Sequence, residues 1–404
     1  MDAIVNRIAP SAVQLRSQRL VRFDCGHRLF VAQSQSQSQS HRFRQLRPRS
    51  TLSASRRPSP SSSHLYKSSS AAFFHSSASS LKNPAKSSTM SVPQAVQNPL
   101  TKAATFLVLT INSSTPSATQ TVRSVLSSVQ DLSKNVSLRD LNSQFSCAVG
   151  IGSDAWDLLT DGISGLRRPK ELRPFREIAG ARHTAVSTPG DLLFHIRSDR
   201  RDICFEFERQ LLLKLGDAAT VVDDTQGFRY FDARDLLGFV DGTANPVGPS
   251  VPDAVLIADE DSDCAGGSYV VVQKYVHDMS GWTGLSTETQ EAIIGRTKID
   301  NMELDDQPDG HQQAHKTLAT IEDDDGNEYS IIRDNMPFGS PGAGVFGTYF
   351  IGYSRRLWVI EKMLERMFIG DPPGKHDRIL DFSTALTGTT FYTPPAWVLD
   401  RLGD

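Results

Sequence analysis

A chain of 404 residues is long enough for two domains with a substantial core, and a hydrophobic fraction of 38% is ordinary for a globular protein. Residues 1–90 hold 14 Lys+Arg and two acids, which leaves residues 91–404 with 29 Lys+Arg, 44 Asp+Glu and a net charge of −15. This acidic body disfavours nucleic acid as a partner, and no segment approaches the roughly 18 apolar residues of a membrane span.

The first 90 residues differ in composition from the rest of the chain. They are rich in Ser, Arg and Gln and nearly free of acids, which is typical of an organellar transit peptide. We therefore expect a leader over residues 1–90 and a mitochondrial location. A chloroplast location, a generic disordered tail and a cytosolic form that starts at Met90 are the alternatives.

Beyond residue 100, strands and helices alternate in two successive rounds. The first round contains strands at 105–111, 144–150, 191–197, 220–224 and 228–232, and helices at 118–134 and 202–215. The second round contains strands at 268–276 and 348–353, and helices at 287–295 and 358–368. This order predicts two α+β domains with antiparallel sheets and helices on one face of each. The few, widely spaced cysteines predict no disulfide framework.

The segment Gly238-Phe-Val-Asp-Gly-Thr-Ala-Asn-Pro246 places one carboxylate, Asp241, in a tight loop at the end of an apolar run. Gly238 and Gly242 allow backbone angles that other residues resist and allow a flat ligand to approach closely. A carboxyl group among apolar neighbours can have a raised pKa and act as an acid-base group. The simpler interpretation is an Asp-Gly turn between two strands.

Two histidines, His311 and His315, have the i, i+4 spacing of a zinc-binding helix. A metalloprotease would carry Glu next to the first histidine, but Gln312 stands there, so a water-activating base is missing. A single neutral imidazole that binds iron is chemically simpler. A structural role for each histidine is the remaining alternative.

Arg333 follows two isoleucines and therefore leaves a predicted buried strand. A guanidinium in such a place needs a carboxylate or a bound anion as its partner, and an ion pair with Asp334 is one solution. Asn335 lies two residues further, on the same face of a strand, so both side chains could donate hydrogen bonds into one pocket.

Together these segments resemble the dye-decolorizing-type haem peroxidase family, most nearly its bacterial, YfeX-like branch. Besides 238–246, the resemblance rests on the strings at 266–275, 293–298, 333–339 and 377–385, and it covers roughly residues 100–400. It implies an α+β fold of two ferredoxin-like domains of the dimeric α+β barrel type. We expect these domains at residues 100–246 and 247–404, with one haem b per chain held mainly by the second.

The resemblance also implies the site residues by position. His315 would be the iron ligand, and Asp241, Arg333 and Asn335 would be the catalytic groups on the opposite face. The residues expected to contact haem are Asp241, Gly242, Thr243, Arg296, His315 and Arg333. A carboxylate, either Asp377 or Asp381, would support the ligand histidine.

The implied activity is reduction of hydrogen peroxide through a ferryl intermediate, with oxidation of small organic reductants such as dyes, phenols or porphyrins. The resemblance also implies a homo-oligomer. The alternative function is a haem-binding or haem-handling protein, either deferrochelatase-like or a carrier, with incidental peroxidase activity. A zinc hydrolase built on His311 and His315 is a weaker rival.

Overall fold

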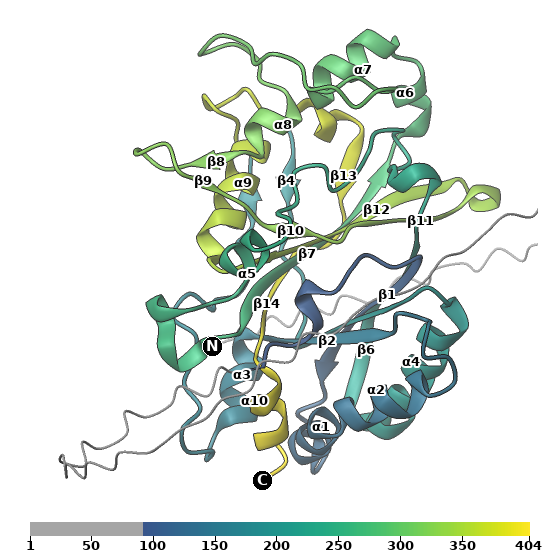
Figure 1. Cartoon of the computed structure of the whole chain (residues 1–404), viewed down its shortest axis with the longest axis vertical. Helices are drawn as coiled ribbons and strands as arrows, with labels where there is room; N and C mark the ends of the chain where they lie inside the picture. Colours follow the sequence, from purple (N-terminus) through teal and green to yellow (C-terminus); the bar gives the residue numbers. More distant parts are fainter. Residues whose placement is uncertain (1–91) are drawn as a thin grey trace, which may run out of the picture. The chain divides into compact units, whose positions relative to one another are not determined.

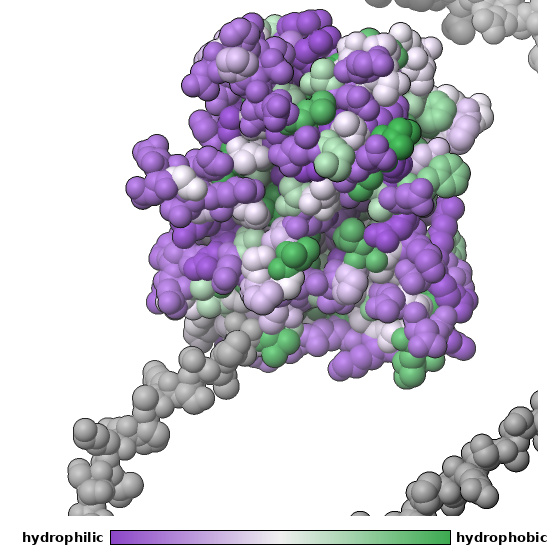
Figure 2. Space-filling model, turned by 45° about the horizontal axis from the view of Figure 1, so that its top comes forward, coloured by the Kyte–Doolittle hydropathy of each residue, from purple (hydrophilic) through white to green (hydrophobic). Residues whose placement is uncertain are grey.

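The protein is described by a computed structural model that covers residues 92–404. The predicted leader of residues 1–90 and the alternative start at Met90 lie outside the described residues. No helix within 92–404 is long and apolar enough to cross a membrane. The face in Figure 2 is mainly hydrophilic, with hydrophobic residues scattered among polar ones. The three described cysteines are free, as the sequence predicts.

The first half of the described chain contains four long antiparallel strands. In sequence order they are β1 (Ala103–Ile111), β2 (Ser146–Gly152), β5 (Leu192–Ser198) and β6 (Ala219–Phe228), and in the sheet they follow the order β2-β5-β1-β6. The helices of this half are α1 (Ala118–Ser127), α2 (Val129–Ser137), α3 (Ser153–Thr160) and α4 (Arg201–Leu215). A small hairpin is formed by β3 (Ile178–Ala179) and β4 (Thr184–Ala185).

The second half repeats this arrangement. Its strands are β7 (Ser268–His277), β10 (Ile332–Arg333), β11 (Met336–Ser340), β12 (Val345–Ser354), β13 (Ser383–Ala385) and β14 (Thr389–Thr393). Its helices are α5 (Ser250–Val255), α6 (Met279–Thr283), α7 (Thr287–Ile294), α8 (His315–Leu318), α9 (Leu357–Phe368) and α10 (Ala396–Arg401). A second hairpin is formed by β8 (Ile321–Glu322) and β9 (Glu328–Tyr329).

Both halves place their strands in the same ferredoxin-like order: fourth, first, third, second. In the second half this order is β14-β7-β12, followed by β10 and β11, which both pair with β12. The two sheets join where β14 pairs with β2, so that ten strands form one sheet. The α+β fold of two ferredoxin-like halves is thereby confirmed. The boundary between residues 246 and 247 stays a prediction.

The sheet curves so that its far edges meet. Gly227 of β6 lies against Met336 of β11 so closely that a Cβ at residue 227 would be 2.5 Å from the Met336 Cβ. Inside the curved sheet, side chains of both halves form one apolar core, in which the Phe106 and Tyr349 rings stack with centroids 4.1 Å apart. Figure 1 shows α1, α2 and α4 beyond the strands at one end and α6 to α9 at the other.

Because strands are covered on both faces, β1 is apolar at almost every position and not only at alternate ones. The two faces of β7 differ in what they contact. Val270 and Val272 point into the core inside the sheet, whereas Gln273, Tyr275 and His277 point toward the helices of the second half. The functional cavity lies on that helix side.

The structure corrects two predicted elements of the first half. The single helix expected at 118–134 is broken at Ser128 into α1 and α2, because the hydroxyls of Ser127 and Ser128 donate to the carbonyls of residues 124 and 125. The strand expected at 220–224 is longer, since β6 (Ala219–Phe228) pairs with β1 along its length. The strand expected at 228–232 is wrong, because β6 ends at Phe228 and residues 231–233 form a 3₁₀ turn.

Candidate active site

A cavity lies between β7, β12 and α9, the loop around Asp241 that precedes α5, and the segment that follows α7. It has an inner part of about 180 Å³ and an outer part of about 870 Å³, and His315, Asp241 and Arg333 line both parts. The inner walls are largely apolar and include Phe239, Tyr275, Phe350, Met363, Leu364 and Leu380. The outer walls carry charged side chains, including Arg296, Lys316, Lys362, Arg366, Glu322 and Glu328.

His315 is the first residue of α8, and one of its two ring nitrogens is held firmly. Nδ1 donates a hydrogen bond of 2.6 Å to Oδ2 of Asp377, whose side chain is fully buried. The other Asp377 oxygen accepts from the backbone N–H of Ile379. Burial alone would lower the pKa of His315, but the Asp377 carboxylate outweighs it and raises that pKa. Of the two expected carboxylates, Asp377 therefore contacts His315 and Asp381 does not.

This hydrogen bond also determines the tautomer of His315. With the proton on Nδ1, Nε2 carries the free lone pair that a metal ligand needs. Nε2 has no hydrogen-bond partner among residues 92–404, and the ring lines the cavity with about a third of the side chain exposed.

Asp241 lies in a loop that two glycines shape, since Gly238 has φ 97° and Gly242 has φ 74°, both in the left-handed region. Oδ1 of Asp241 accepts a hydrogen bond of 2.7 Å from the Gly242 N–H and one of 3.3 Å from the Asn335 side chain. Burial raises the pKa of Asp241, and these hydrogen bonds offset part of the rise. A carboxyl group with a raised pKa, as the sequence predicts, is thus present at Asp241.

Arg333 ends β10 and enters the cavity without a carboxylate partner. Within the described part of the chain, its guanidinium makes one side-chain contact at hydrogen-bond range, 3.7 Å from Nη2 to Sδ of Met363. Burial lowers the pKa of Arg333, which the charge of Asp241 opposes. The expected ion pair with Asp334 is wrong, because Asp334 points to the other side of the sheet and pairs with Arg197 at 2.8 Å.

Two asparagines hold Arg333 and Asp241 in place. Asn245 makes two hydrogen bonds to the backbone of Arg333. Its Oδ1 accepts one from the Arg333 N–H at 2.9 Å, and its Nδ2 donates one to the Arg333 carbonyl at 2.7 Å. Asn335 accepts from the Ile351 N–H and donates to Asp241. The loop that carries Asp241 is therefore fastened to the strand that carries Arg333.

Three further predicted contact residues lie at the outer part of the cavity. Gly242 and Thr243 line it, and Arg296 lies on the same wall. Arg296 donates to Oε2 of Glu303 at 2.9 Å and to the Asn301 carbonyl at 3.2 Å. Unlike Arg333, it is therefore already paired.

The weaker rival, a zinc site built on His311 and His315, is not supported by the structure. His311 is exposed, and among residues 92–404 it hydrogen-bonds only to the carbonyls of Pro308 and Asp309. The helix begins at His315, because Ala314 is extended with ψ 162°, so the two histidines do not share a helical face.

Sequence reasoning missed two residues of the site. Asn245 belongs to the glycine-rich segment, but nothing in its spacing indicated that it would hold Arg333. Asp235 lines the inner cavity, where burial raises its pKa to about 7 and the nearby Asp241 adds to the rise. Its position six residues before Asp241 carried no periodic signal, since the intervening chain is a turn.

Comparison with known proteins identifies the family of the chain. Residues 93–229 match the model of the Dyp-type peroxidase N-terminal domain, and residues 232–398 match that of the C-terminal domain. The chain belongs to the Dyp-type peroxidase family. It is 54% identical over 309 residues to a dye-decolorizing peroxidase of Mycobacterium tuberculosis, across 76% of this chain and 90% of that relative.

Solved structures of Dyp-type peroxidases agree with the fold. DyPB from Rhodococcus jostii RHA1 matches with a TM-score of 0.73 and 54% identity, across 77% of this chain and 98% of that one. A variant of the same protein in complex with haem matches with a TM-score of 0.73, 53% identity and coverage of 76% and 98%. This Dyp-type peroxidase is accordingly a haem-dependent oxidoreductase that acts on peroxide.

Proposed function

We propose that the cavity holds one haem b with His315 as the iron ligand, and that Asp241 and Arg333 carry the reaction with hydrogen peroxide on the opposite face. One observation supports this assignment above the others. A partly buried guanidinium, which has no ion-pair partner within residues 92–404, lines the same cavity as a carboxyl of raised pKa and an imidazole with a free Nε2. Such a set is costly to bury unless a ligand completes it.

The residues present fit haem. Nε2 of His315 supplies one neutral ligand, as haem iron requires from a proximal histidine. The apolar inner walls suit the porphyrin, and the cations of the outer part, among them Arg296 and Lys316, suit its propionates. The combined cavity is also of the size of ligand sites, roughly 300–1,000 Å³.

When bound, haem supplies the iron at which peroxide is held and the electrons with which the O–O bond is broken. Asp241 accepts the proton from the inner peroxide oxygen and returns it to the outer oxygen, which leaves as water. Arg333 donates hydrogen bonds to the departing oxygen and stabilises the negative charge that develops there. Asn335 orients the Asp241 carboxylate for both transfers.

Asp377 contributes through His315. By accepting the Nδ1 proton in a hydrogen bond, it fixes the orientation of the ring and makes Nε2 a stronger electron donor. Small organic reductants would approach through the outer part of the cavity. A haem carrier would need His315 but neither Asp241 nor Arg333, so the haem-handling alternative is not favoured. A homo-oligomer and an organellar location remain predictions.

The experiment is a peroxidase assay of haem-loaded protein with an anthraquinone dye or a phenol. We expect turnover at least roughly 10²-fold above that of the same concentration of free haemin, because proton transfer and charge stabilisation each contribute about that much. Turnover equal to that of free haemin would contradict the proposal.

A further inference from the structure

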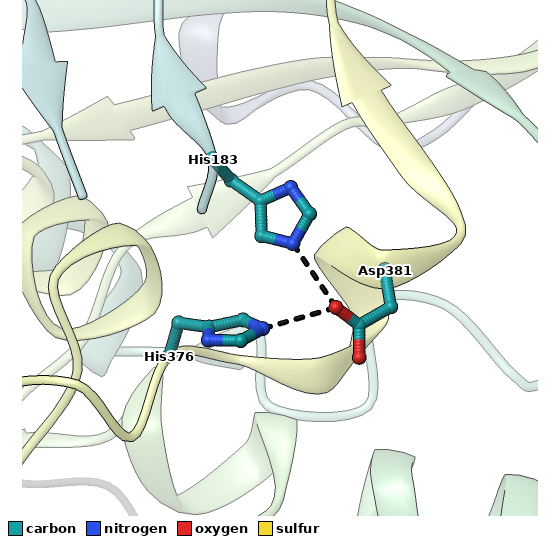
Figure 3. A group of neighbouring side chains, drawn as sticks. All are labelled: His183, His376 and Asp381. Carbon is teal, nitrogen blue, oxygen red and sulfur yellow. Dashed lines mark hydrogen bonds and ion pairs between the residues drawn. The ribbon is translucent and has the colours of Figure 1, made fainter. Parts of the chain in front are cut away.

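A second group of potential metal ligands lies outside the haem cavity. His183 is in the turn between β3 and β4, His376 follows α9, and Asp381 ends the short 3₁₀ helix Arg378–Asp381. Figure 3 shows both imidazoles pointing at the same carboxylate oxygen. Nε2 of each histidine lies 3.0 Å from Oδ1 of Asp381, although His183 and Asp381 are 198 residues apart in sequence.

The spacing of these atoms fits a tetrahedral ion. The three candidate ligand atoms all lie within 4.8 Å of one another. In a tetrahedral zinc site with bonds of about 2.0–2.1 Å, ligand atoms are roughly 3.3 Å apart. The two Nε2–Oδ1 distances of 3.0 Å are within a few tenths of an ångström of this spacing, so small side-chain rotations would admit an ion among the three residues.

The chemistry of the ligands selects the kind of ion. Two imidazole nitrogens and one carboxylate oxygen suit Zn²⁺ and similar transition metals, whereas Ca²⁺ and Mg²⁺ prefer oxygen ligands only. The side chains are 24%, 11% and 16% exposed for His183, His376 and Asp381, so water can supply a fourth ligand. We propose that His183, His376 and Asp381 form a second metal site that binds Zn²⁺ or a divalent transition-metal ion of similar preference.

Two arginines near Asp381 set the strength of this site. Arg182 lies 3.4 Å and Arg378 3.7 Å from the carboxylate, and their side chains are 65% and 44% exposed. Both can turn into solvent when an ion enters. Because both arginines keep their positive charge, they still weaken the binding of a cation, so the site should have moderate affinity.

The site lies next to Asp377, the carboxylate that accepts a hydrogen bond from His315. His376 precedes Asp377, and Asp381 ends the 3₁₀ helix that Asp377 caps. The Gly180 end of the β3–β4 turn packs against the Phe368 carbonyl at the end of α9. An ion here would tie the hairpin of the first half to the segment that positions Asp377, and it should raise the unfolding temperature of the protein.

The direct test is calorimetric titration of chelator-treated, haem-loaded protein with ZnCl₂. We expect one Zn²⁺ per chain with a micromolar or tighter dissociation constant. Loss of outer-shell partners alone costs roughly 10–100-fold in metal affinity, so His183→Ala and Asp381→Asn should cost at least that much. His311→Ala, which removes an exposed histidine elsewhere, should bind Zn²⁺ as the wild type does.

Arg182→Ala gives an independent test with the opposite sign. Removing this positive charge should tighten Zn²⁺ binding several-fold without a change in the haem spectrum. The proposal is overturned if the wild type binds no Zn²⁺ at micromolar concentrations, or if His183→Ala and Asp381→Asn bind as tightly as His311→Ala does.

Discussion

The two halves of the molecule share one strand order but differ in how each pairs an arginine of the sheet. Arg197 in the first half is 1% exposed and pairs with Asp334, also 1% exposed, at 2.8 Å. Arg333 in the second half is next to Asp334 in sequence, yet it has no ion-pair partner within residues 92–404. Adjacent residues at the end of β10 thus serve two faces of the sheet: Asp334 pairs with Arg197, and Arg333 is left for a ligand.

The same contrast holds for the space between sheet and helices. In the first half this space is filled by apolar side chains of β1, β5 and the facing helices, such as Leu107, Phe194 and Phe207. In the second half, the short α8 and the glycine-shaped loop of Asp241 replace a long covering helix, and a cavity remains. A repeated fold therefore acquires function where its packing is left incomplete.

The largest kinetic effect is expected at Asp241. Asp241→Asn keeps the size of the side chain and its contact with Asn335 but cannot accept a proton. The rate constant for the reaction of haem-loaded protein with peroxide, measured by stopped flow, should fall roughly 10²–10⁴-fold. An unchanged rate constant would show that another group moves the proton.

The pH dependence of this rate constant follows from the raised pKa of Asp241. Only the carboxylate can accept the peroxide proton, so the wild-type rate should fall as pH drops through a pKa above the ordinary range of Asp. Asp241→Asn should lack this acidic limb. If the variant shows the same limb, the limb belongs to a different group.

Arg333→Leu should lower the same rate constant by about 10²–10³-fold, since one donor to the developing charge is lost. Haem binding should persist. The unfolding temperature of the haem-free protein should stay the same or rise, because Leu replaces a buried charge that no carboxylate balances.

Arg197→Met is the matched control for this arginine. This substitution leaves Asp334 as a buried charge without its arginine partner, so it should lower the free energy of unfolding by about 3–5 kcal/mol. Whatever protein remains folded should react with peroxide at close to the wild-type rate. Equal losses of stability in both variants would remove the distinction between the two arginines.

A smaller effect is expected at Asp377. Asp377→Asn keeps a hydrogen-bond partner for Nδ1 of His315 but removes its charge, so haem affinity should fall by roughly 10–100-fold. Titration of the haem-free protein with haemin measures this change. Asp381→Asn is the comparison here, since Asp381 does not contact His315 and should leave haem affinity unchanged.

Much of the fold and part of the candidate site could be predicted from the sequence. The glycine-rich segment identified Asp241, and the apolar strand before Arg333 indicated a buried guanidinium. The partner of that guanidinium could not be predicted, because the side of the sheet to which Asp334 points depends on the break between β10 and β11. The role of Asn245 could not be predicted either, and the choice between Asp377 and Asp381 as the partner of His315 stayed open, since each contact joins segments more than 60 residues apart.

The cluster at Asp381 shows the same limit. His183 and His376 come from different halves, and no local pattern links them. Pairing between distant segments depends on the tertiary fold, whereas loop shape and strand burial are encoded locally.

The most direct test of the central claim is the absorption spectrum of haem-reconstituted His315→Ala beside that of the wild type and His311→Ala. We predict that the wild type and His311→Ala show the same histidine-ligated ferric haem spectrum, and that His315→Ala loses it. A His315→Ala spectrum that matches the wild type would contradict the placement of iron at Nε2 of His315.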